Sequence, residues 1–369
     1  MSSHDKNSKL LGLEVLRFIS AIAVLFWHYQ HFSYVADKAV DFVTEQQPLY
    51  HAFALFYRYG FYGVQIFWTI SGFIFFWKYS SEIGEGRIGA RRFFVLRFSR
   101  LYPLHFATML LVGCLQMIYL AQRGYYFVYQ HNDIKHLVLN LFMASHWGLQ
   151  DGYSFNAPIW SISVEVLVYL LFFLTLRFAG RSPWVNLAVL LLCGAGKWMG
   201  ATSPVVDAVA YFYAGGLAAQ AFRALEQSPM RARGRYAAFV ALILVPLAAH
   251  AVQHAAHYPK EQVIPLFLLA YLPFVLFLIA RDFQAPAPVQ RVIEAAGNMT
   301  YSSYLIHFPI QLSLAIWCNW QGRPIPYHSV KFFALFMLLT LVAAYYLYRC
   351  FELPAQNLIR RTMSRRDGT

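Results

Sequence analysis

Long apolar stretches recur along the whole chain, separated by short polar segments. The first, LLGLEVLRFISAIAVLFWHYQHF at 10–32, is long enough for a helix to cross a bilayer. Segment 132–147 is apolar at helical spacing but shorter, so we expect an interfacial or re-entrant helix there. The pattern predicts an all-α, polytopic membrane protein with ten transmembrane helices, at about 11–32, 61–78, 101–121, 158–178, 185–201, 205–223, 236–255, 262–281, 299–319 and 330–351.

Composition and charge support this class and orient the helices. Hydrophobic residues make up 59% of the 369 residues and charged residues only 13%, too few to cover a soluble protein. Most of the 30 Lys and Arg residues flank the predicted helices on one side, which predicts that both termini are cytoplasmic. The same bias accounts for the net charge of +13, so no nucleic-acid partner is needed.

No predicted loop is long enough for a second globular domain. We therefore expect a single transmembrane domain over 1–369, with no soluble domain and with the first apolar segment kept as a helix. The two longest outer loops, 33–60 and 122–157, could cap an outward-facing site.

Arg17 and His28 are the most informative polar residues in the apolar pattern. They lie eleven residues apart, so a helix places them on one face, about 16 Å apart along its axis. Ionisable side chains at membrane depth usually line a cavity or a pathway, which suggests a site reached from both sides. A plain ion pair between Arg17 and Glu14, three residues earlier, is the alternative.

Other predicted spans also carry polar side chains near their middle. Glu165 needs either a structural cation partner or a function as an acid, and the sequence leaves both open. His307 follows Tyr304 by one helical turn and is either a packing histidine or a catalytic group. Ser163, like any lone serine in such a helix, is expected to bond to its own backbone unless it lines a pocket.

A basic stretch, ARRFFVLRFSRLYPLH, precedes the third predicted span. Arg97 and Arg100 lie where we expect a helix to begin, with Pro103 in its first turn. A helix N-terminus with arginines suits phosphate groups, although ordinary positive-inside bias would also explain these arginines.

Taken together, these segments resemble acyltransferase family 3, integral-membrane O-acyltransferases of carbohydrates and related acceptors. The resemblance covers nearly the whole chain, and Arg17 and His28 occupy its Arg/Lys-x10-His signature. Six ordered pieces carry it, namely LRFISAIAVLFWH, ISGFI, LRFSRLYP, WSISVEV, MTYSSYLIHFPI and FELP. The chain departs from the family at Val166, where a second acid is usual, and at Trp68 and Thr69 in the second predicted helix.

The resemblance implies transfer of an acyl group, most often acetyl, from acyl-CoA to a sugar hydroxyl. Our hypothesis makes His28 the general base. The other candidate catalytic residues, which would orient His28 or stabilise the oxyanion, are Glu165, Tyr304 and His307. The candidate acyl-CoA-binding residues are Arg17, Arg97 and Arg100, and the candidate pocket residues are Trp68, Ser71 and Ser163.

Acetyl-CoA would be a substrate, so we expect no bound cofactor and no metal. The expected partners are membrane lipid, a carbohydrate or lipid-linked saccharide acceptor, and polysaccharide-assembly proteins. The expected location is a bacterial inner membrane. An acyl-enzyme intermediate is an alternative route. A transporter or flippase without covalent chemistry is an alternative function, and a membrane anchor for a polysaccharide machine is a weaker one.

Two further motifs offer rival chemistry. His146 and Asp151 match the H-x4-D signature of glycerolipid acyltransferases, but on the predicted outer side, away from cytoplasmic donors. His250, His254 and His257 share a helix face as a metal comb would, although interfacial histidines are the simpler interpretation.

Overall fold

The computed structural model describes residues 10–226, 228–255, 259–281 and 285–364. His257, one of the three histidines of the expected helix face, lies outside these residues. Almost all regular structure in the described part is helical, and the strands β1 (Tyr34–Val35) and β2 (Lys38–Ala39) form a short antiparallel pair. An all-α fold is therefore confirmed.

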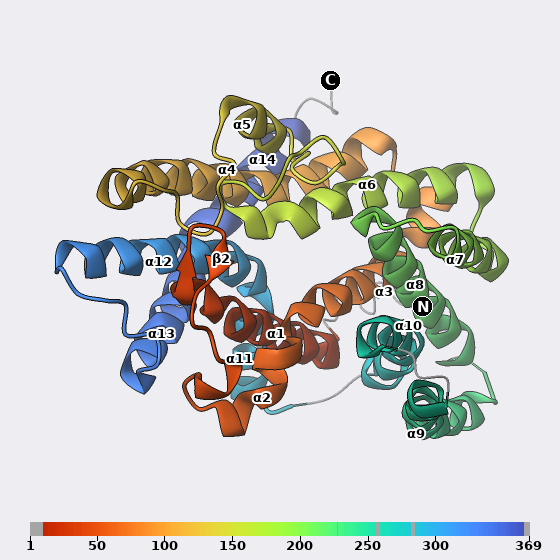
Figure 1. The fold of residues 1–369 in the computed structure, drawn as a ribbon. Coiled ribbons are helices and arrows are strands. Elements are labelled where there is room, and N and C mark those ends of the chain that lie inside the picture. Colours follow the sequence, from red (N-terminus) through yellow and green to blue (C-terminus); the bar gives the residue numbers. More distant parts are fainter. Residues whose placement is uncertain (1–9, 227, 256–258, 282–284, 365–369) are drawn as a thin grey trace. The chain divides into compact units, whose positions relative to one another are not determined.

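The helices follow one another along the chain as Figure 1 shows. The α-helices are α1 (Leu11–His28), α2 (Tyr50–Tyr59), α3 (Gly63–Gly84), α4 (Ala90–Arg123), α5 (Ile134–Leu141), α6 (Trp160–Leu174), α7 (Pro183–Trp198), α8 (Pro204–Glu226), α9 (Arg231–Ala255), α10 (Lys260–Ile279), α11 (Ala287–Asn298), α12 (Thr300–Trp320), α13 (Val330–Leu347) and α14 (Leu353–Ser364). The 3-10 helices are η1 (Tyr29–Ser33), η2 (Thr44–Gln46), η3 (Gly60–Tyr62) and η4 (Ala157–Ile159), and the π-helical turns are η5 (Thr175–Ala179) and η6 (Tyr348–Glu352).

Within the described residues, 8 helical stretches are long and apolar enough to cross a membrane. They are Leu11–Ser33, Tyr50–Gly84, Ala90–Arg123, Ala157–Ala179, Pro204–Glu226, Arg231–His254, Lys260–Ile279 and Val330–Met363. Two expected spans also form helices but are not among the eight, because α7 has only 16 residues and α12 carries many polar side chains. The membrane class is confirmed, whereas the count of ten and the orientation of the termini stay predictions.

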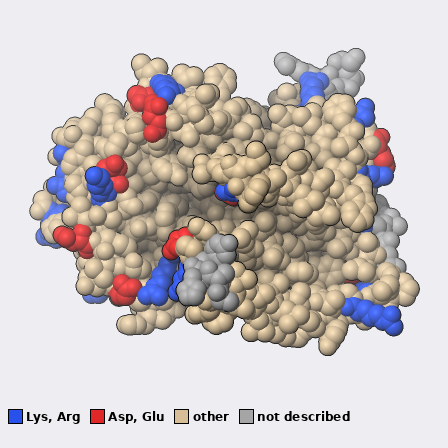
Figure 2. Space-filling view, turned by 45° about the vertical axis from the view of Figure 1, so that its right-hand side comes forward, with Lys and Arg blue, Asp and Glu red and all other residues tan. Residues whose placement is uncertain are grey.

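Uncharged side chains dominate the face of the molecule in Figure 2. Large apolar residues are exposed on several helices, for example Leu191 and Leu192 on α7 and Leu338 on α13. Exposed apolar surface of this extent is typical of helices that face lipid rather than water.

The chain divides into two compact units by its internal contacts. Unit 1 comprises Met1–Arg17, Val64–Gly89 and Leu167–Glu294, and unit 2 comprises Phe18–Gly63, Ala90–Val166 and Ala295–Thr369. The boundary falls inside α1, directly after Arg17, although this helix is continuous. Each unit is described by itself below, and the single-domain expectation stays a prediction.

Glycines let two helices of unit 1 approach closely. Gly72 of α3 lies against the backbone of Phe212 in α8, where an added Cβ would overlap the carbonyl oxygen. Gly215 of α8 lies in the same way against the carbonyl of Thr69. Small residues are what membrane helices use to pack backbone against backbone. The glycine of ISGFI therefore has a packing function.

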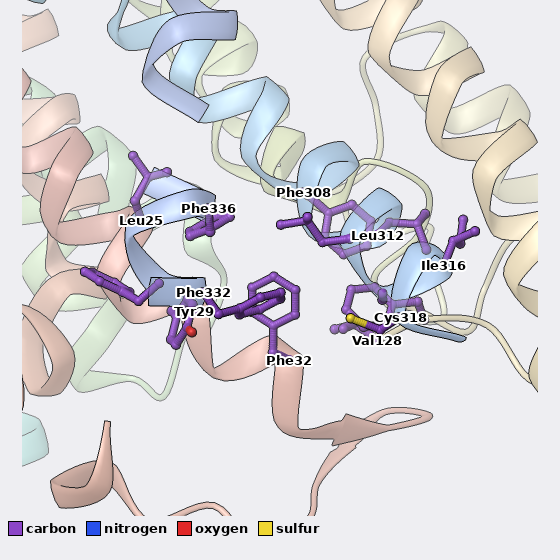
Figure 3. Packing of buried hydrophobic residues seen from close by; sticks show 14 of the residues in the cluster. Leu25, Tyr29, Phe32, Val128, Phe308, Leu312, Ile316, Cys318, Phe332 and Phe336 are labelled. Carbon is purple, nitrogen blue, oxygen red and sulfur yellow. The ribbon is translucent and has the colours of Figure 1, made fainter. Parts of the chain in front are cut away.

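Unit 2 packs around α12, which contacts both α4 and α13. Figure 3 shows Leu25, Tyr29 and Phe32 on one side of this core and Phe308 and Leu312 of α12 on the other. The side chains interlock through edge-to-face ring contacts, for example between Tyr29 and Phe333 with centroids 5.0 Å apart. This apolar core holds the end of α1 against α12.

The helix α4 begins earlier than the sequence pattern predicts. It starts at Ala90 and continues through Pro103, so the expectation of a helix N-terminus beside Arg97 and Arg100 was wrong. Pro103 therefore lies inside the helix. Because proline has no N–H, the helix lacks the hydrogen bond to the carbonyl of the residue four positions earlier. The helix α4 packs along both α12 and α14.

Candidate active site

Three imidazole rings meet in unit 2. His28 is the last residue of α1, His31 lies in η1 and His307 lies in α12. The ring centroid of His28 is 4.7 Å from that of His307 and 5.0 Å from that of His31. All three side chains are buried, with exposed fractions of 6%, 3% and 0% in the order His28, His31, His307. A 3-10 turn has three residues, so η1 returns His31 to the side of His28.

The hydrogen bond of His28 determines which of its nitrogens can act as a base. Nδ1 lies 2.9 Å from the carbonyl oxygen of Val24, one turn earlier in α1. A carbonyl only accepts, so Nδ1 must carry the proton and donate it. In the neutral ring the lone pair is then on Nε2, and the described residues give Nε2 no hydrogen bond. His28 is thus oriented as a proton acceptor.

Gln311 joins α12 to the end of α1. Its Nε2 donates to the backbone carbonyl of His28 at 2.8 Å. The last carbonyls of a helix have no intrahelical partner, so this bond caps α1 at the residue that carries the imidazole. Gln311 lies one turn after His307 and also approaches the His31 ring. The sequence analysis missed both Gln311 and His31, although both lie one turn from a candidate residue.

Tyr304 extends the cluster along α12. Its ring centroid is 6.0 Å from that of His307, and its hydroxyl lies 2.9 Å from Oγ of Ser161 in α6. Ser161 therefore bonds across to another helix as well as to its own backbone. Glu165 lies one turn after Ser161 on α6, and no hydrogen bond joins it to His28. The structure thus brings His307 against His28 and Tyr304 against His307, and Glu165 lies on α6, the helix whose Ser161 bonds Tyr304.

The segment between α4 and α6 contacts this cluster through Tyr129. The Tyr129 ring lies 5.6 Å from His31 and 4.7 Å from Phe308, measured between centroids. Gln116 of α4 anchors the segment by donating to and accepting from the backbone of Phe127, both at 2.8 Å. Burial raises the pKa of the Tyr129 phenol well above its usual value, so it stays a neutral donor.

Arg17 pairs with Glu14 within unit 1. Its guanidinium lies 3.1 Å from a Glu14 carboxylate oxygen, and the exposed side-chain fractions are 20% for Arg17 and 11% for Glu14. The ion pair between Glu14 and Arg17, which was the alternative interpretation of the sequence, is therefore present. A contact with an anionic donor would have to share the guanidinium with Glu14.

Arg100 is held by a buried acid of the FELP motif. Its guanidinium lies 3.5 Å from Oε1 of Glu352, which also accepts from Gln356 at 3.1 Å. The other carboxylate oxygen accepts from Ser302 of α12 at 2.7 Å. Arg97 lies three residues before Arg100 and is half-buried. The sequence analysis did not select Glu352, although its place in a motif and its apolar surroundings were signals.

The three expected pocket residues fall in different units of the chain. Trp68 is buried and Ser71 half-buried in α3 of unit 1, whereas Ser163 belongs to unit 2. Ser163 accepts the backbone N–H of His146 through Oγ at 3.2 Å and the indole N–H of Trp147 through its carbonyl at 2.8 Å. Instead of bonding to its own backbone, it anchors the loop before α6.

The rival H-x4-D pair is engaged elsewhere. Asp151 forms an ion pair with Lys135 at 2.8 Å, which lowers the pKa of its carboxyl. The His146 ring stacks on Tyr153 with centroids 5.2 Å apart. Neither contact prepares the pair for acid–base chemistry.

Among the described residues, His131, Asp133 and His136 are the three ligand-type side chains close enough to approach one metal ion. His136 already uses both nitrogens, since Nδ1 donates to Asp133 at 2.8 Å and Nε2 accepts the Asp151 N–H at 3.1 Å. Asp133 also caps α5 by accepting the His136 N–H. Asp133 and His136 therefore form the N-terminal cap of α5 and hold the loop that contains Asp151.

Comparison with known proteins turns the motif resemblance into an assignment. A family model described as an acyltransferase domain matches residues 10–349. The chain belongs to acyltransferase family 3. The acyltransferase MdmB of Streptomyces mycarofaciens is similar to it, with 28% identity over 177 residues, or 47% of this chain and 41% of that relative. The alignment therefore spans less than half of the relative's length, and no solved structure matches the chain.

Membership of acyltransferase family 3 gives the chain an acyltransferase domain with multiple helices long and apolar enough to cross a membrane. It favours covalent group transfer over the transporter and anchor hypotheses. The imidazole cluster, which contains the signature histidine His28, is the part of this acyltransferase best suited to proton transfer.

Proposed function

We propose that this acyltransferase moves an acyl group, in the first instance acetyl, from cytoplasmic acyl-CoA to a hydroxyl of a sugar. The observation that carries the proposal is the fixed orientation of His28. Its Nδ1–H is committed to the Val24 carbonyl, which leaves the Nε2 lone pair for the acceptor. A general base so oriented contributes about 10²–10⁴-fold to rate.

The reaction balances with His28 alone as proton carrier. The acceptor oxygen attacks the thioester carbonyl carbon while Nε2 takes the hydroxyl proton. The tetrahedral intermediate collapses with cleavage of the C–S bond, and the imidazolium returns the proton to the departing CoA thiolate. His307 lies beside His28 and Tyr304 lies beside His307, and these two residues are the candidates to donate to the oxyanion.

Glu165 has an indirect role in this scheme. It lies one turn after Ser161 on α6, and Ser161 bonds the Tyr304 hydroxyl. We propose that Glu165 orients the Tyr304–Ser161 pair, whose two hydroxyl oxygens are 2.9 Å apart.

Three arginines are the proposed binding residues for acyl-CoA, the acyl donor. Arg97 and Arg100 lie in α4, and we propose that they bind CoA phosphates, with Arg100 kept in place by Glu352. Arg17 would guide the donor along α1 towards His28, sharing its guanidinium with Glu14. We place acetyl-CoA among the substrates, so the proposed reaction uses no resident cofactor.

The proposed acceptor, membrane and partner proteins are inferred from the family, because no contact among the described residues identifies them. We propose a carbohydrate or a lipid-linked saccharide as acceptor and a bacterial inner membrane as location. Polysaccharide-assembly proteins would be the partners. Neighbouring genes for glycosyltransferases and a polymerase would support this context.

The test is a comparison of two histidine variants in the full-length protein. His28→Gln keeps a polar side chain but loses the basic nitrogen. His51→Gln makes the same change at an exposed position of α2. Radiolabelled acetyl-CoA is supplied with acceptor-bearing membranes from cells that lack the gene, and CoA thiol release and acetyl incorporation are measured. We expect His28→Gln to lose at least about 100-fold in kcat and His51→Gln to match the wild type.

Retention of near-wild-type transfer by a normally inserted His28→Gln protein would overturn the base assignment. The same assay separates direct transfer from an acyl-enzyme route. Label trapped on the protein when acceptor is omitted indicates a covalent intermediate, whereas ternary-complex kinetics without such label indicate direct attack.

A further inference from the structure

Besides the candidate base, the imidazole cluster contains buried polar atoms that the reaction scheme leaves unused. We propose that His31 and Gln311 form a subsite for a second hydroxyl group of the acceptor, next to the hydroxyl that His28 deprotonates. This inference rests on the proposed function, because it needs His28 to be the base. It assigns acceptor binding to two residues outside the recognised motifs.

The first observation is a concentration of buried polar atoms with no good hydrogen-bond partner among the described residues. Both ring nitrogens of His307, Nδ1 of His31 and Oε1 of Gln311 are of this kind. Native proteins satisfy most of their buried polar groups, so several unsatisfied atoms at one place indicate a polar ligand.

The second observation is that these atoms are held near the base. The rings of His31 and His307 both contact that of His28, with centroids 5.0 Å and 4.7 Å away. Gln311 donates one end of its amide to the His28 carbonyl at 2.8 Å, which fixes the position of the other end. The unused atoms therefore lie close to the imidazole that would take the proton of the acceptor hydroxyl.

Counting protons shows why one hydroxyl cannot satisfy them. A hydroxyl has one hydrogen to donate and two lone pairs that accept. Nε2 of His28 and the unprotonated nitrogen of a neutral His307 both require a donated hydrogen, whereas Oε1 of Gln311 lies beside the His31 ring, whose N–H can donate to it. The reacting hydroxyl supplies only the first. A second hydroxyl close by supplies another and accepts from an imidazole N–H.

The chemistry of the subsite thus selects a compound with neighbouring hydroxyl groups, such as a vicinal diol of a sugar ring. A simple alcohol would leave Nδ1 of His31 and a nitrogen of His307 unsatisfied in a buried site. Sites built to bond a substrate hydroxyl discriminate strongly against analogues that lack it. Tyr129, whose ring lies beside His31, provides an aromatic surface at the same place.

The experiment uses the full-length enzyme, acetyl-CoA and a titration of acceptor-bearing membranes from cells that lack the gene. His31→Phe keeps a ring against Tyr34 and Tyr129 but removes both nitrogens, and His31→Gln restores hydrogen bonding. Gln311→Met keeps the length of the side chain without its amide. Ser313→Ala, on an exposed side of the same helix, is the control.

We expect His31→Phe and Gln311→Met to raise the KM for acceptor about tenfold, the effect of one lost hydrogen bond. The KM for acetyl-CoA should stay within about twofold of the wild type for both. His31→Gln should recover most of the loss of His31→Phe. An equal effect of His31→Phe on both KM values, or on kcat alone, would mean a structural role and overturn the subsite.

The wild-type product gives a second test that no misfolded variant can obscure. NMR of the acetylated product should place the acetyl group on a carbon whose neighbour carries a free hydroxyl. An acetyl group whose neighbouring carbons both lack a hydroxyl contradicts the inference while leaving acyl transfer intact. Complete absence of transfer by the wild type would instead contradict the proposed function.

Discussion

A buried hydrogen bond between α12 and the FELP motif gives the most quantitative prediction. Ser302 is fully buried and donates to Oε2 of Glu352 at 2.7 Å, while Glu352 itself is 1% exposed. Hydrogen bonds to a charged group contribute about 1.5–3 kcal/mol, so Ser302→Ala should cost about 2 kcal/mol of unfolding free energy. The neighbouring Ser303 is equally buried, but it donates to the Thr300 carbonyl of its own helix. Ser303→Ala should therefore cost less than about 1 kcal/mol.

A double-mutant cycle isolates the interaction. Glu352→Gln removes the charge that also attracts Arg100, whose side chain is 26% exposed and can recover water. We expect a cost of about 2–3 kcal/mol, below the usual loss for a fully buried pair. In the double variant, Ser302→Ala should cost about 1 kcal/mol less than it does alone.

The assay is reversible unfolding of the purified protein in mixed micelles, followed by helical circular dichroism. Equal losses for Ser302→Ala and Ser303→Ala would refute the reasoning. So would a cycle that is additive to within about 0.5 kcal/mol.

Two further predictions concern helix packing and the loop before α6. Gly72→Ala should lower stability because its Cβ would overlap the Phe212 carbonyl oxygen, whereas Gly194→Ala, with open space around it, should raise stability by up to about 1 kcal/mol. Thermal denaturation in detergent compares them, and equal effects would contradict the packing function. Hydrogen bonds from His136 lower the pKa of the Asp133 carboxyl, so its stabilisation is present above the usual carboxyl pKa and is lost as the pH falls through the lowered value. Hydrogen exchange of α5 at decreasing pH should show this loss, and Asp133→Asn should abolish the pH dependence.

The sequence was sufficient to predict the helical membrane class and the family. Apolar runs of bilayer length are a local property, so they survive any arrangement of the helices. The same holds for the Arg17 and His28 signature, because both residues lie on the single continuous helix α1. Local reasoning failed at Pro103, where packing along neighbouring helices extends α4 back to Ala90.

Only the tertiary structure decided which polar residues meet. The ring of His307 lies against that of His28 although about 280 residues separate them, and Gln311 bonds the His28 carbonyl across the same interval. Such contacts depend on how helices pack, and hydrophobic periodicity carries no information on the partner of a buried polar atom. For the same reason the sequence could not show that Arg100 pairs with Glu352. Chain-local chemistry thus determined the class of this acyltransferase, and helix packing determined its candidate active site.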